Sequence, residues 1–152
     1  MPTGVLLVDD HAILRQALKR LLESCPDFVV VAEAGSGPEA VELAEKHRPD
    51  VALMDIGMKG MNGIEATAQL LRRSPQTAVL MLTVHSSEHY VRHAVKAGAR
   101  GYLLKDAVEE ELVPAIQLAQ KGGRYFSPAV AKYVGEGDPH PAVPTKRERP
   151  QG

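Results

Sequence analysis

Short apolar runs alternate with amphipathic segments five times along the first 134 residues of this chain. The apolar runs are almost continuously hydrophobic, which predicts strands that are buried on both faces, as in a parallel sheet. These predicted strands are Val5–Val8, Phe28–Ala34, Val51–Asp55, Ala78–Thr83 and Gly101–Leu104. The segments between them have helical periodicity and predict helices at His11–Ser24, Pro38–His47, Gly63–Arg73, Glu88–Ala97 and a last one ending near Lys121. Five β/α units in this order predict a doubly wound α/β domain with a parallel sheet.

Residues at the predicted helix ends support these boundaries. Asn62 with Glu65 three residues later has the pattern of a capping pair, and Gly98 suits the end of the fourth helix. Pro114 lies inside the last predicted helix. Proline lacks a backbone N–H and crowds the preceding turn, so it disturbs a regular helix. It therefore predicts either a kink or a later start of that helix, nearer Glu110.

Composition places the chain among ordinary single domains. The 152 residues carry 18 Lys and Arg against 19 Asp and Glu, so the net charge of -1 argues against a surface that coats nucleic acid or an anionic membrane. The single cysteine, Cys25, cannot form an internal disulfide, which favours a reducing compartment. No apolar run reaches bilayer length and the N-terminus lacks a signal peptide pattern, so we expect a cytoplasmic protein.

The end of the chain differs from the rest in composition. Residues 135–152 hold 3 Gly and 4 Pro in 18 positions and contain little that can be buried. Such a composition predicts a flexible linker or tail. The folded domain is therefore expected to span residues 1–134.

Polar residues end four of the five predicted strands. Asp9 and Asp10 follow the first strand, Asp55 ends the third, Thr83 ends the fourth and Lys105 follows the fifth. The carboxyl ends of parallel strands meet at one edge of the sheet, where ligands bind in doubly wound folds. Converging carboxylates repel each other unless a cation lies between them, and hard oxygen ligands suit Mg²⁺. A lysine and a hydroxyl at the same edge suit phosphoryl oxygens, so the set predicts handling of phosphate with a divalent ion.

The sequence around these residues resembles a known family. The motifs are V-D-D at the first strand, M-D-I-G-M-K-G-M-N-G-I-E-A around Asp55, L-T-V-H at the fourth strand and G-Y-L-L-K-D-A at the fifth. Over about residues 4–126 the chain resembles the receiver domain of bacterial two-component response regulators, most closely the NarL/FixJ-like subfamily. The resemblance implies a flavodoxin-like (β/α)5 fold with strand order 2-1-3-4-5.

The resemblance also implies roles for individual residues. Asp55 would be the phosphoacceptor, taking a phosphoryl group from a phosphohistidine of a partner sensor histidine kinase. Mg²⁺ would be held by Asp9, Asp10, Asp55 and the backbone carbonyl of Gly57. Because phosphoryl transfer depends mostly on positioning and charge neutralisation, the metal and Lys105 would supply most of the catalysis.

A conformational switch is implied as well. Thr83 would move onto the new phosphoryl oxygen, and Tyr102 would turn inward into the space vacated. The chain departs from the family pattern at Lys59, where proline is usual, so this loop is expected to be more mobile. The resemblance also implies that Gly57 and His85 occupy two positions that tune how fast water removes the phosphoryl group, and we hypothesise that His85 modulates that lifetime.

The final residues suggest what the domain controls. Thr145–Arg149 reads T-K-R-E-R and looks like the opening of a LuxR-type helix-turn-helix domain, although a solvated charge run explains it equally well. Under the first interpretation the chain is the receiver part of a transcription factor that dimerises on phosphorylation and binds DNA only through a domain absent here. Two other functions stay open: a Mg²⁺-dependent phosphatase or phosphotransferase with turnover, and a pseudo-receiver that only binds partners.

Three further patterns have simpler explanations. Gly35–Ala40 matches the G-x-G-x-x-A dinucleotide fingerprint, but Pro38 removes a backbone donor, and a tight turn before a capped helix is the better interpretation. His89 and His93 share one helix face and can bind zinc, yet a solvated face is expected because no further ligand is evident. Cys25 is expected to be a packing residue.

Overall fold

The computed structural model describes residues 2–134, so the predicted linker at 135–152 and the Thr145–Arg149 motif lie outside the described residues. The described chain forms one parallel sheet with the order β2-β1-β3-β4-β5-β6. Its strands are β1 (Thr3–Val8), β2 (Phe28–Ala34), β3 (Val51–Met54), β4 (Ala78–Thr83), β5 (Gly101–Leu104) and β6 (Tyr125–Phe126). The predicted doubly wound α/β fold and the strand order 2-1-3-4-5 are therefore confirmed, with one strand added.

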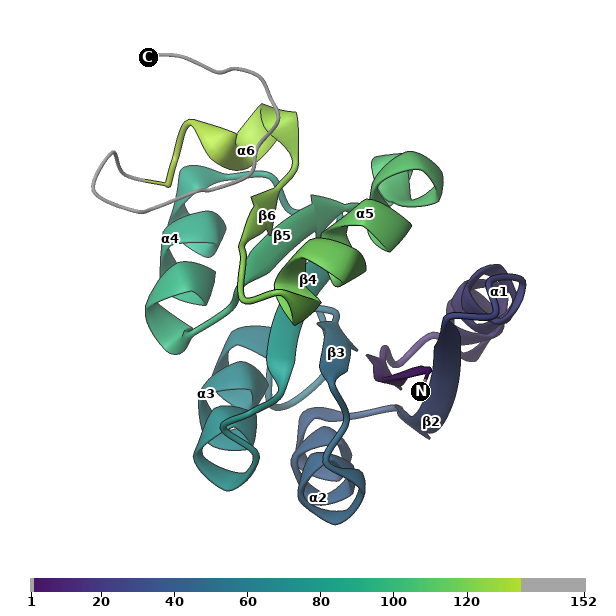
Figure 1. Cartoon of the computed structure of the whole chain (residues 1–152). Helices are drawn as coiled ribbons and strands as arrows, with labels where there is room; N and C mark the ends of the chain where they lie inside the picture. The colour runs from purple at the N-terminus through teal and green to yellow at the C-terminus, as the bar shows by residue number, and fades with distance from the viewer. Residues whose placement is uncertain (1, 135–152) are drawn as a thin grey trace.

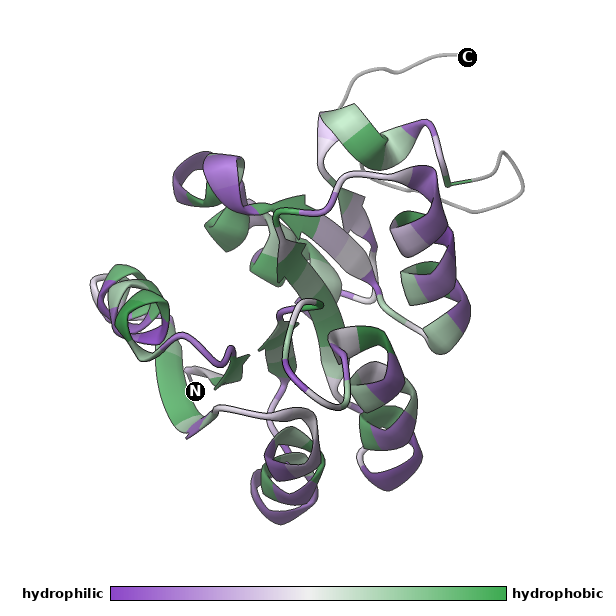
Figure 2. Ribbon diagram, turned by 180° about the vertical axis from the view of Figure 1, so that it is seen from behind, coloured by the Kyte–Doolittle hydropathy of each residue, from purple (hydrophilic) through white to green (hydrophobic). Residues whose placement is uncertain are grey.

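The helices cover both faces of the sheet (Figure 1). They are α1 (Ala12–Glu23), α2 (Gly37–His47), α3 (Gly63–Arg73), α4 (Glu88–Ala97), α5 (Val108–Gln120) and α6 (Pro128–Ala131). Helices α1 and α5 pack on one face through residues such as Leu22 and Ile116, in one cluster with Leu7 and Leu53 of the sheet. Helices α2, α3 and α4 pack on the opposite face. Figure 2 shows hydrophobic strands in the centre and hydrophilic outer faces on the helices, as the alternating pattern predicted.

The sixth strand is an addition that the sequence did not predict. Tyr125 and Phe126 pair in parallel with Gly101 and Tyr102 of β5. A side chain at Gly101 would meet the backbone oxygen of Tyr125 at 2.6 Å, so glycine permits this close approach. The Phe126 side chain is buried with the core of the α4 face. Two residues are too short to show the periodicity by which strands are recognised.

Helix ends largely follow the predicted signals. Asn62 and Glu65 form a complete capping box at the start of α3, and Gly98 ends α4 with a left-handed backbone. Helix α5 begins at Val108, directly after a 3-10 turn η1 (Lys105–Ala107), and continues through Pro114. The alternative of a start nearer Glu110 was therefore wrong. Pro114 and Glu110 are both exposed, so water can replace the missing backbone donor.

Within residues 2–134, none of the helices combines the length and the apolar character that crossing a membrane requires.

Candidate functional site

Adjacent strands bring Asp9 and Asp55 together at the carboxyl edge of the sheet. Strands β1 and β3 pair in parallel, with Val8 opposite Met54, so the residue after each strand occupies the same level. The backbone N–H of Asp55 donates to the carbonyl oxygen of Val8 at 3.0 Å. Both carboxylates are buried, with 2% of Asp9 and 5% of Asp55 exposed. Two acids in this position carry a large desolvation cost, which requires positive charge nearby.

Lys105 supplies that charge from the far side of β4. Its Nζ lies 3.2 Å from Oδ2 of Asp9 and 3.5 Å from Oδ1 of Asp55. Lys105 begins the 3-10 turn that follows β5, and its side chain is mostly buried. The predicted convergence of Asp9, Asp55 and Lys105 is therefore present in the structure.

Asp10 completes the group of carboxylates but is bonded differently. Its Oδ2 accepts a 3.3 Å hydrogen bond from the backbone N–H of Lys59. Its Oδ1 is buried and accepts no hydrogen bond within the described structure. The Lys59 contact is informative because proline, the residue expected at this position, has no N–H to donate. We therefore infer that Lys59 anchors the loop to Asp10, whereas the sequence suggested only greater mobility.

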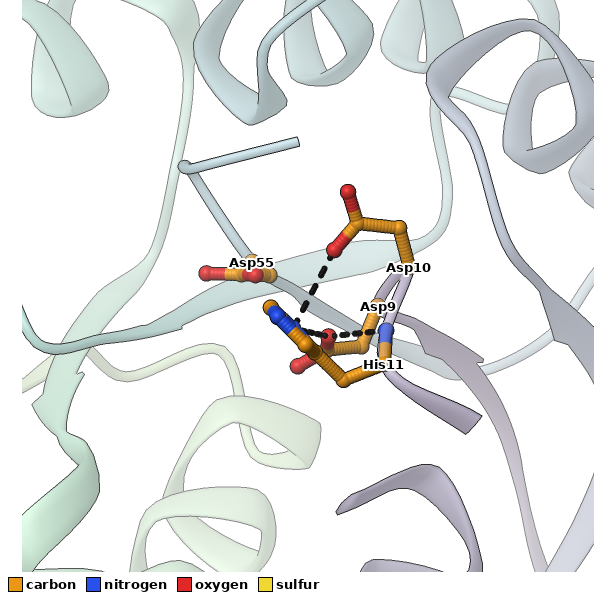
Figure 3. A group of neighbouring side chains, drawn as sticks. All are labelled: Asp9, Asp10, His11 and Asp55. Carbon is orange, nitrogen blue, oxygen red and sulfur yellow. Dashed lines mark hydrogen bonds and ion pairs between the residues drawn. The ribbon is translucent and has the colours of Figure 1, made fainter. Parts of the chain in front are cut away.

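His11 is a member of this group that sequence reasoning missed (Figure 3). Its Nδ1 lies 3.0 Å from Oδ1 of Asp9 and 3.2 Å from Oδ1 of Asp10. Arg15, one helical turn further on α1, was missed too; its guanidinium donates to the backbone oxygen of Asp9. The signal available in the sequence was the spacing of four between His11 and Arg15, which places both on the helix face that begins at the acidic pair.

The surroundings of Asp55 make its carboxyl group costly to ionise. Burial raises the pKa of Asp55 above its ordinary value, and the nearby Asp9 raises it further, while Lys105 and the Gly57 backbone N–H act in the opposite direction. The Gly57 N–H donates to Oδ1 of Asp55 at 3.3 Å. A buried carboxylate held in this way gains stability from any cation that joins it.

Thr83 and Tyr102 lie together near the end of β4, both fully buried. The Thr83 Oγ1 accepts a 3.2 Å hydrogen bond from the backbone N–H of His85, and the Tyr102 hydroxyl donates to the carbonyl oxygen of His85 at 2.6 Å. Burial raises the pKa of the Tyr102 hydroxyl above its ordinary value, so it is a permanent donor. Tyr102 is thus already turned inward in this structure, an orientation that the sequence associated with the phosphorylated state.

His85 also lies close to the loop that carries Asp55. Its Nε2 is 3.4 Å from the position that a Cβ on Gly57 would occupy. The ring stacks on Tyr90 of α4, with the ring centroids 4.5 Å apart. The two positions predicted to tune the phosphoryl lifetime, Gly57 and His85, are therefore neighbours.

Gly63 is a further requirement of the site that the sequence did not reveal. A Cβ at this position would lie 2.0 Å from the backbone oxygen of Asp55, a distance that no real contact has. Helix α3 therefore begins directly against the phosphoacceptor candidate. The backbone N–H of Gly63 donates to the carbonyl oxygen of Ile56 at 3.0 Å and so closes the loop between β3 and α3.

The donor set fits a divalent cation. One ligand atom from each of Asp9, Asp10, His11 and Asp55 lies within 4.8 Å of the others. Three of the four residues offer carboxylate oxygens, the ligands that hard cations prefer, and Asp10 also has a buried Oδ1 without a hydrogen bond. A cation bound among these residues would give Asp10 Oδ1 a partner and would reduce the electrostatic repulsion between Asp9 and Asp55.

Comparison with known families agrees with this geometry. Residues 5–117 match the model of the response regulator receiver domain. The chain belongs to this family.

Two curated regulatory proteins are similar in sequence to this chain. The chain is 46% identical over 126 residues to the transcriptional regulatory protein DegU of Brevibacillus brevis, covering 83% of this chain and 53% of DegU. It is 44% identical over 136 residues to the nitrate/nitrite response regulator protein NarP of Escherichia coli, covering 89% of this chain and 63% of NarP. The receiver domain thus spans between about half and two thirds of these curated relatives.

Solved structures give the same assignment. A two-component response regulator of the LuxR family from Aurantimonas superimposes with a TM-score of 0.84 at 36% identity, covering 88% of this chain and 96% of that one. The signal receiver domain of the response regulator NarL from Mycobacterium tuberculosis gives a TM-score of 0.75 at 38% identity, covering 80% of this chain and 98% of that one. The chain is therefore a receiver domain of the LuxR/NarL type, a module of phosphorylation-based two-component signalling.

The glycine-rich turn and Cys25 have structural roles in the receiver domain. Ser36 caps α2 by accepting from the Glu39 N–H, and Met61 packs where a Gly37 side chain would be, so the glycine-rich turn is a helix start and contact surface. Cys25 packs against the core beside α1.

His89 and His93 are exposed on α4, with ring centroids 4.3 Å apart. Among residues 2–134, the acidic group around Asp55 is the only cluster of three or more potential metal ligands. The exposure of both side chains agrees with the solvated face expected on α4.

Proposed function

We propose that this receiver domain accepts a phosphoryl group on Asp55 from a sensor histidine kinase in the presence of Mg²⁺. The observation that carries the proposal is the position of Lys105, whose Nζ lies 3.5 Å from Oδ1 of Asp55 and 3.2 Å from Oδ2 of Asp9. A buried carboxylate with a fixed ammonium beside it and further acids around it is arranged for a charged reactant and a cation rather than for structure alone.

The chemistry proposed for Asp55 is a single phosphoryl transfer. A carboxylate oxygen of Asp55 forms a bond to phosphorus, while the bond from phosphorus to the donor breaks and its electron pair leaves with the donor group. Lys105 neutralises charge on the phosphoryl oxygens. Asp9, Asp10, Asp55 and the Gly57 carbonyl would hold Mg²⁺, which supplies further charge neutralisation at the same oxygens when bound.

The response to phosphorylation is proposed to run through Thr83 and His85. The Thr83 hydroxyl now accepts a hydrogen bond from the His85 N–H, and it retains a proton with which to bond a phosphoryl oxygen. A shift of Thr83 toward Asp55 would pull on the loop that Tyr102 also holds through the His85 carbonyl. The change would then reach α4, because the His85 ring stacks on Tyr90.

The lifetime of the phosphoryl group is proposed to depend on His85 and Gly57. The His85 ring lies beside the position of a Gly57 side chain, close to where water must approach the phosphorylated carboxylate. His85→Ala should therefore change the decay rate of the phosphorylated protein, whereas an unchanged rate would remove this role. His47→Ala, at the end of α2, is the matched histidine control.

In the full-length protein we propose a transcriptional output. The relatives include a transcriptional regulatory protein and a nitrate/nitrite response regulator, and the chain spans only 53% and 63% of them. Residues 1–134 would be the receiver domain and 135–152 a linker toward a LuxR-type DNA-binding domain. Phosphorylation would promote homodimerisation in the cytoplasm and DNA binding through that domain.

The decisive experiment is incubation with an acyl phosphate donor and Mg²⁺, followed by intact mass spectrometry. We expect a gain of one phosphoryl group that is abolished by Asp55→Asn and by omission of Mg²⁺ with a chelator. Asp106→Asn, an exposed acid after β5, is the matched control and should retain the gain. Continuous consumption of the donor would instead favour the phosphatase or phosphotransferase, and no modification would favour the pseudo-receiver.

A further inference from the structure

The His11 ring faces the acidic group although α1 does not need it there. His11 is the N-cap residue of α1, yet its side chain makes no capping hydrogen bond. Its ring is 69% exposed and its Nδ1 instead lies 3.0 Å from Asp9 Oδ1 and 3.2 Å from Asp10 Oδ1 (Figure 3). The backbone N–H of His11 also donates to Asp9 Oδ1 at 2.9 Å, which fixes the base of the side chain beside both acids.

These separations match those between ligands of one ion. An octahedral ion with ligands at about 2.1 Å holds neighbouring ligand atoms about 3.0 Å apart, the edge of the octahedron. The two distances from Nδ1, 3.0 and 3.2 Å, are of this size. The ligand atoms of Asp9, Asp10, His11 and Asp55 all lie within 4.8 Å of one another, so one ion can reach all four with small adjustments.

The 3.0 Å hydrogen bond between Nδ1 of His11 and Oδ1 of Asp9 accounts for the contact with Asp9 but not for the approach to Asp10. Asp10 Oδ1 is buried and accepts no hydrogen bond, even though Nδ1 is 3.2 Å away. Asp9 already receives the Lys105 ammonium and the His11 backbone N–H. A cation between Nδ1 and Asp10 Oδ1 would give that oxygen a partner and would replace the hydrogen bond of Nδ1 to Asp9. The imidazole tautomer with its proton on Nε2 leaves the lone pair of Nδ1 available for this.

We propose that His11 is a nitrogen ligand of the divalent ion in this acidic site, so that the site favours ions that accept imidazole, such as Mn²⁺ and Co²⁺, over Mg²⁺. Imidazole suits transition ions, whereas Mg²⁺ prefers oxygen donors and retains its waters. The inference rests on the proposed divalent-ion site at Asp9, Asp10 and Asp55. It adds a residue that determines which ion this site selects.

The test uses a protein without the competing histidine pair. All variants carry His89→Ala and His93→Ala, because these exposed rings lie 4.3 Å apart on α4 and can bind the same ions. His11→Ser removes the imidazole and keeps a residue that favours the N-cap position. His47→Ser is the matched control, since His47 is exposed at the far end of α2. Thermal unfolding without metal verifies that each variant is folded.

Two measurements then decide the question. Titration calorimetry with Co²⁺ and with Mg²⁺ should show that His11→Ser weakens Co²⁺ binding at least about tenfold and changes Mg²⁺ binding less than about threefold. Pulsed electron paramagnetic resonance of bound Mn²⁺ should show coupling to an imidazole nitrogen that His11→Ser abolishes and His47→Ser retains.

The outcomes separate this inference from the proposed function. Mn²⁺ bound without nitrogen coupling, or equal weakening of Co²⁺ and Mg²⁺, would overturn the role of His11 and leave the oxygen site intact. Failure of all three ions to bind the parent protein would overturn the site and the role of His11 together. If the coupling also survives in His11→Ser, another residue is the nitrogen ligand and the inference is wrong.

Discussion

The hydroxyl of Tyr102 donates a 2.6 Å hydrogen bond to the backbone carbonyl oxygen of His85, joining β5 to the loop between β4 and α4. Tyr102 is completely buried, and its own backbone carbonyl accepts from the N–H of Ser127 in the segment after β6. A single residue therefore connects the candidate site to the C-terminal part of the described chain. The inward position of Tyr102 needs no phosphoryl group, because this hydrogen bond already holds it.

Tyr102→Phe removes the hydroxyl and leaves the His85 carbonyl without this donor. We expect the free energy of unfolding to fall by about 1 kcal/mol, the usual net value of a hydrogen bond. Urea denaturation measures the loss, and backbone amide chemical shifts in the β4–α4 loop should change. Tyr133→Phe is the control, since Tyr133 is only partly buried near the end of the described chain. An equal effect of both variants would show that the hydrogen bond does not hold the loop.

Asp55→Asn should stabilise the metal-free protein at neutral pH. The pKa of Asp55 is raised in the folded state, chiefly by burial and then by Asp9, so the folded state binds its proton more tightly than the unfolded state does. Ionised Asp55 therefore costs stability above the folded pKa, and the cost disappears below the ordinary value of 3.8. We expect a gain of about 1 kcal/mol near pH 7, typical in size for a point mutation, that shrinks as the pH falls toward the ordinary value.

Urea denaturation of the wild type, Asp55→Asn and the exposed-acid control Asp106→Asn, without divalent ions, measures this difference at several pH values. Only the gain from Asp55→Asn should depend on pH. Adding Mg²⁺ should stabilise the wild type more than Asp55→Asn, because a ligand that binds only the folded state raises its stability. A gain that stays constant with pH would contradict the raised pKa.

Lys59→Pro removes the backbone N–H that donates to Asp10 Oδ2. We expect Mg²⁺ binding to weaken by up to about tenfold, since one hydrogen bond contributes about 1 kcal/mol. Lys59→Ala keeps the N–H and should bind Mg²⁺ as the wild type does, which separates the backbone donor from the side-chain charge. Titration calorimetry makes the comparison. Equal weakening by both variants would assign the effect to the lysine charge.

Gly63→Ala adds a Cβ that would lie only 2.0 Å from the backbone oxygen of Asp55, which is a severe steric clash. The loop or the start of α3 has to move, and we expect a loss of about 2 kcal/mol or more of unfolding free energy, as in other overpacked positions. Gly35→Ala is the control, because its Cβ would have an ordinary 3.4 Å contact with Arg15. Thermal and urea unfolding of both variants provide the test, and a small effect at position 63 would show that the loop yields easily.

Asn62→Ala should remove the capping box of α3. The Asn62 side chain accepts from the N–H groups of Ile64 and Glu65, and we expect a loss of about 1 kcal/mol when it is removed. Ser87→Ala at the start of α4 is the matched control, because its side chain makes no capping hydrogen bond. Urea denaturation should show a loss at position 62 only.

The sequence by itself determined the order of the five β/α units and the approximate bounds of their helices and strands. Continuous apolar runs at Val51 and Ala78 indicated buried parallel strands, and the pair Asn62 and Glu65 marked a helix start to the residue. These signals are local, because hydrophobic periodicity and capping depend on residues within one or two turns. Since parallel strands end at one edge, the meeting of Asp9, Asp55 and Lys105 also followed from the sequence.

The tertiary structure decided which atoms meet. The approach of the His11 ring to both acids, the Lys59 donor to Asp10 and the fit of Gly63 against Asp55 depend on loop paths that no periodicity encodes. The short strand at Tyr125 exists because β5 offers it an open edge. Such contacts join residues far apart in the sequence, and their energies arise only when packing brings the partners within a few ångströms.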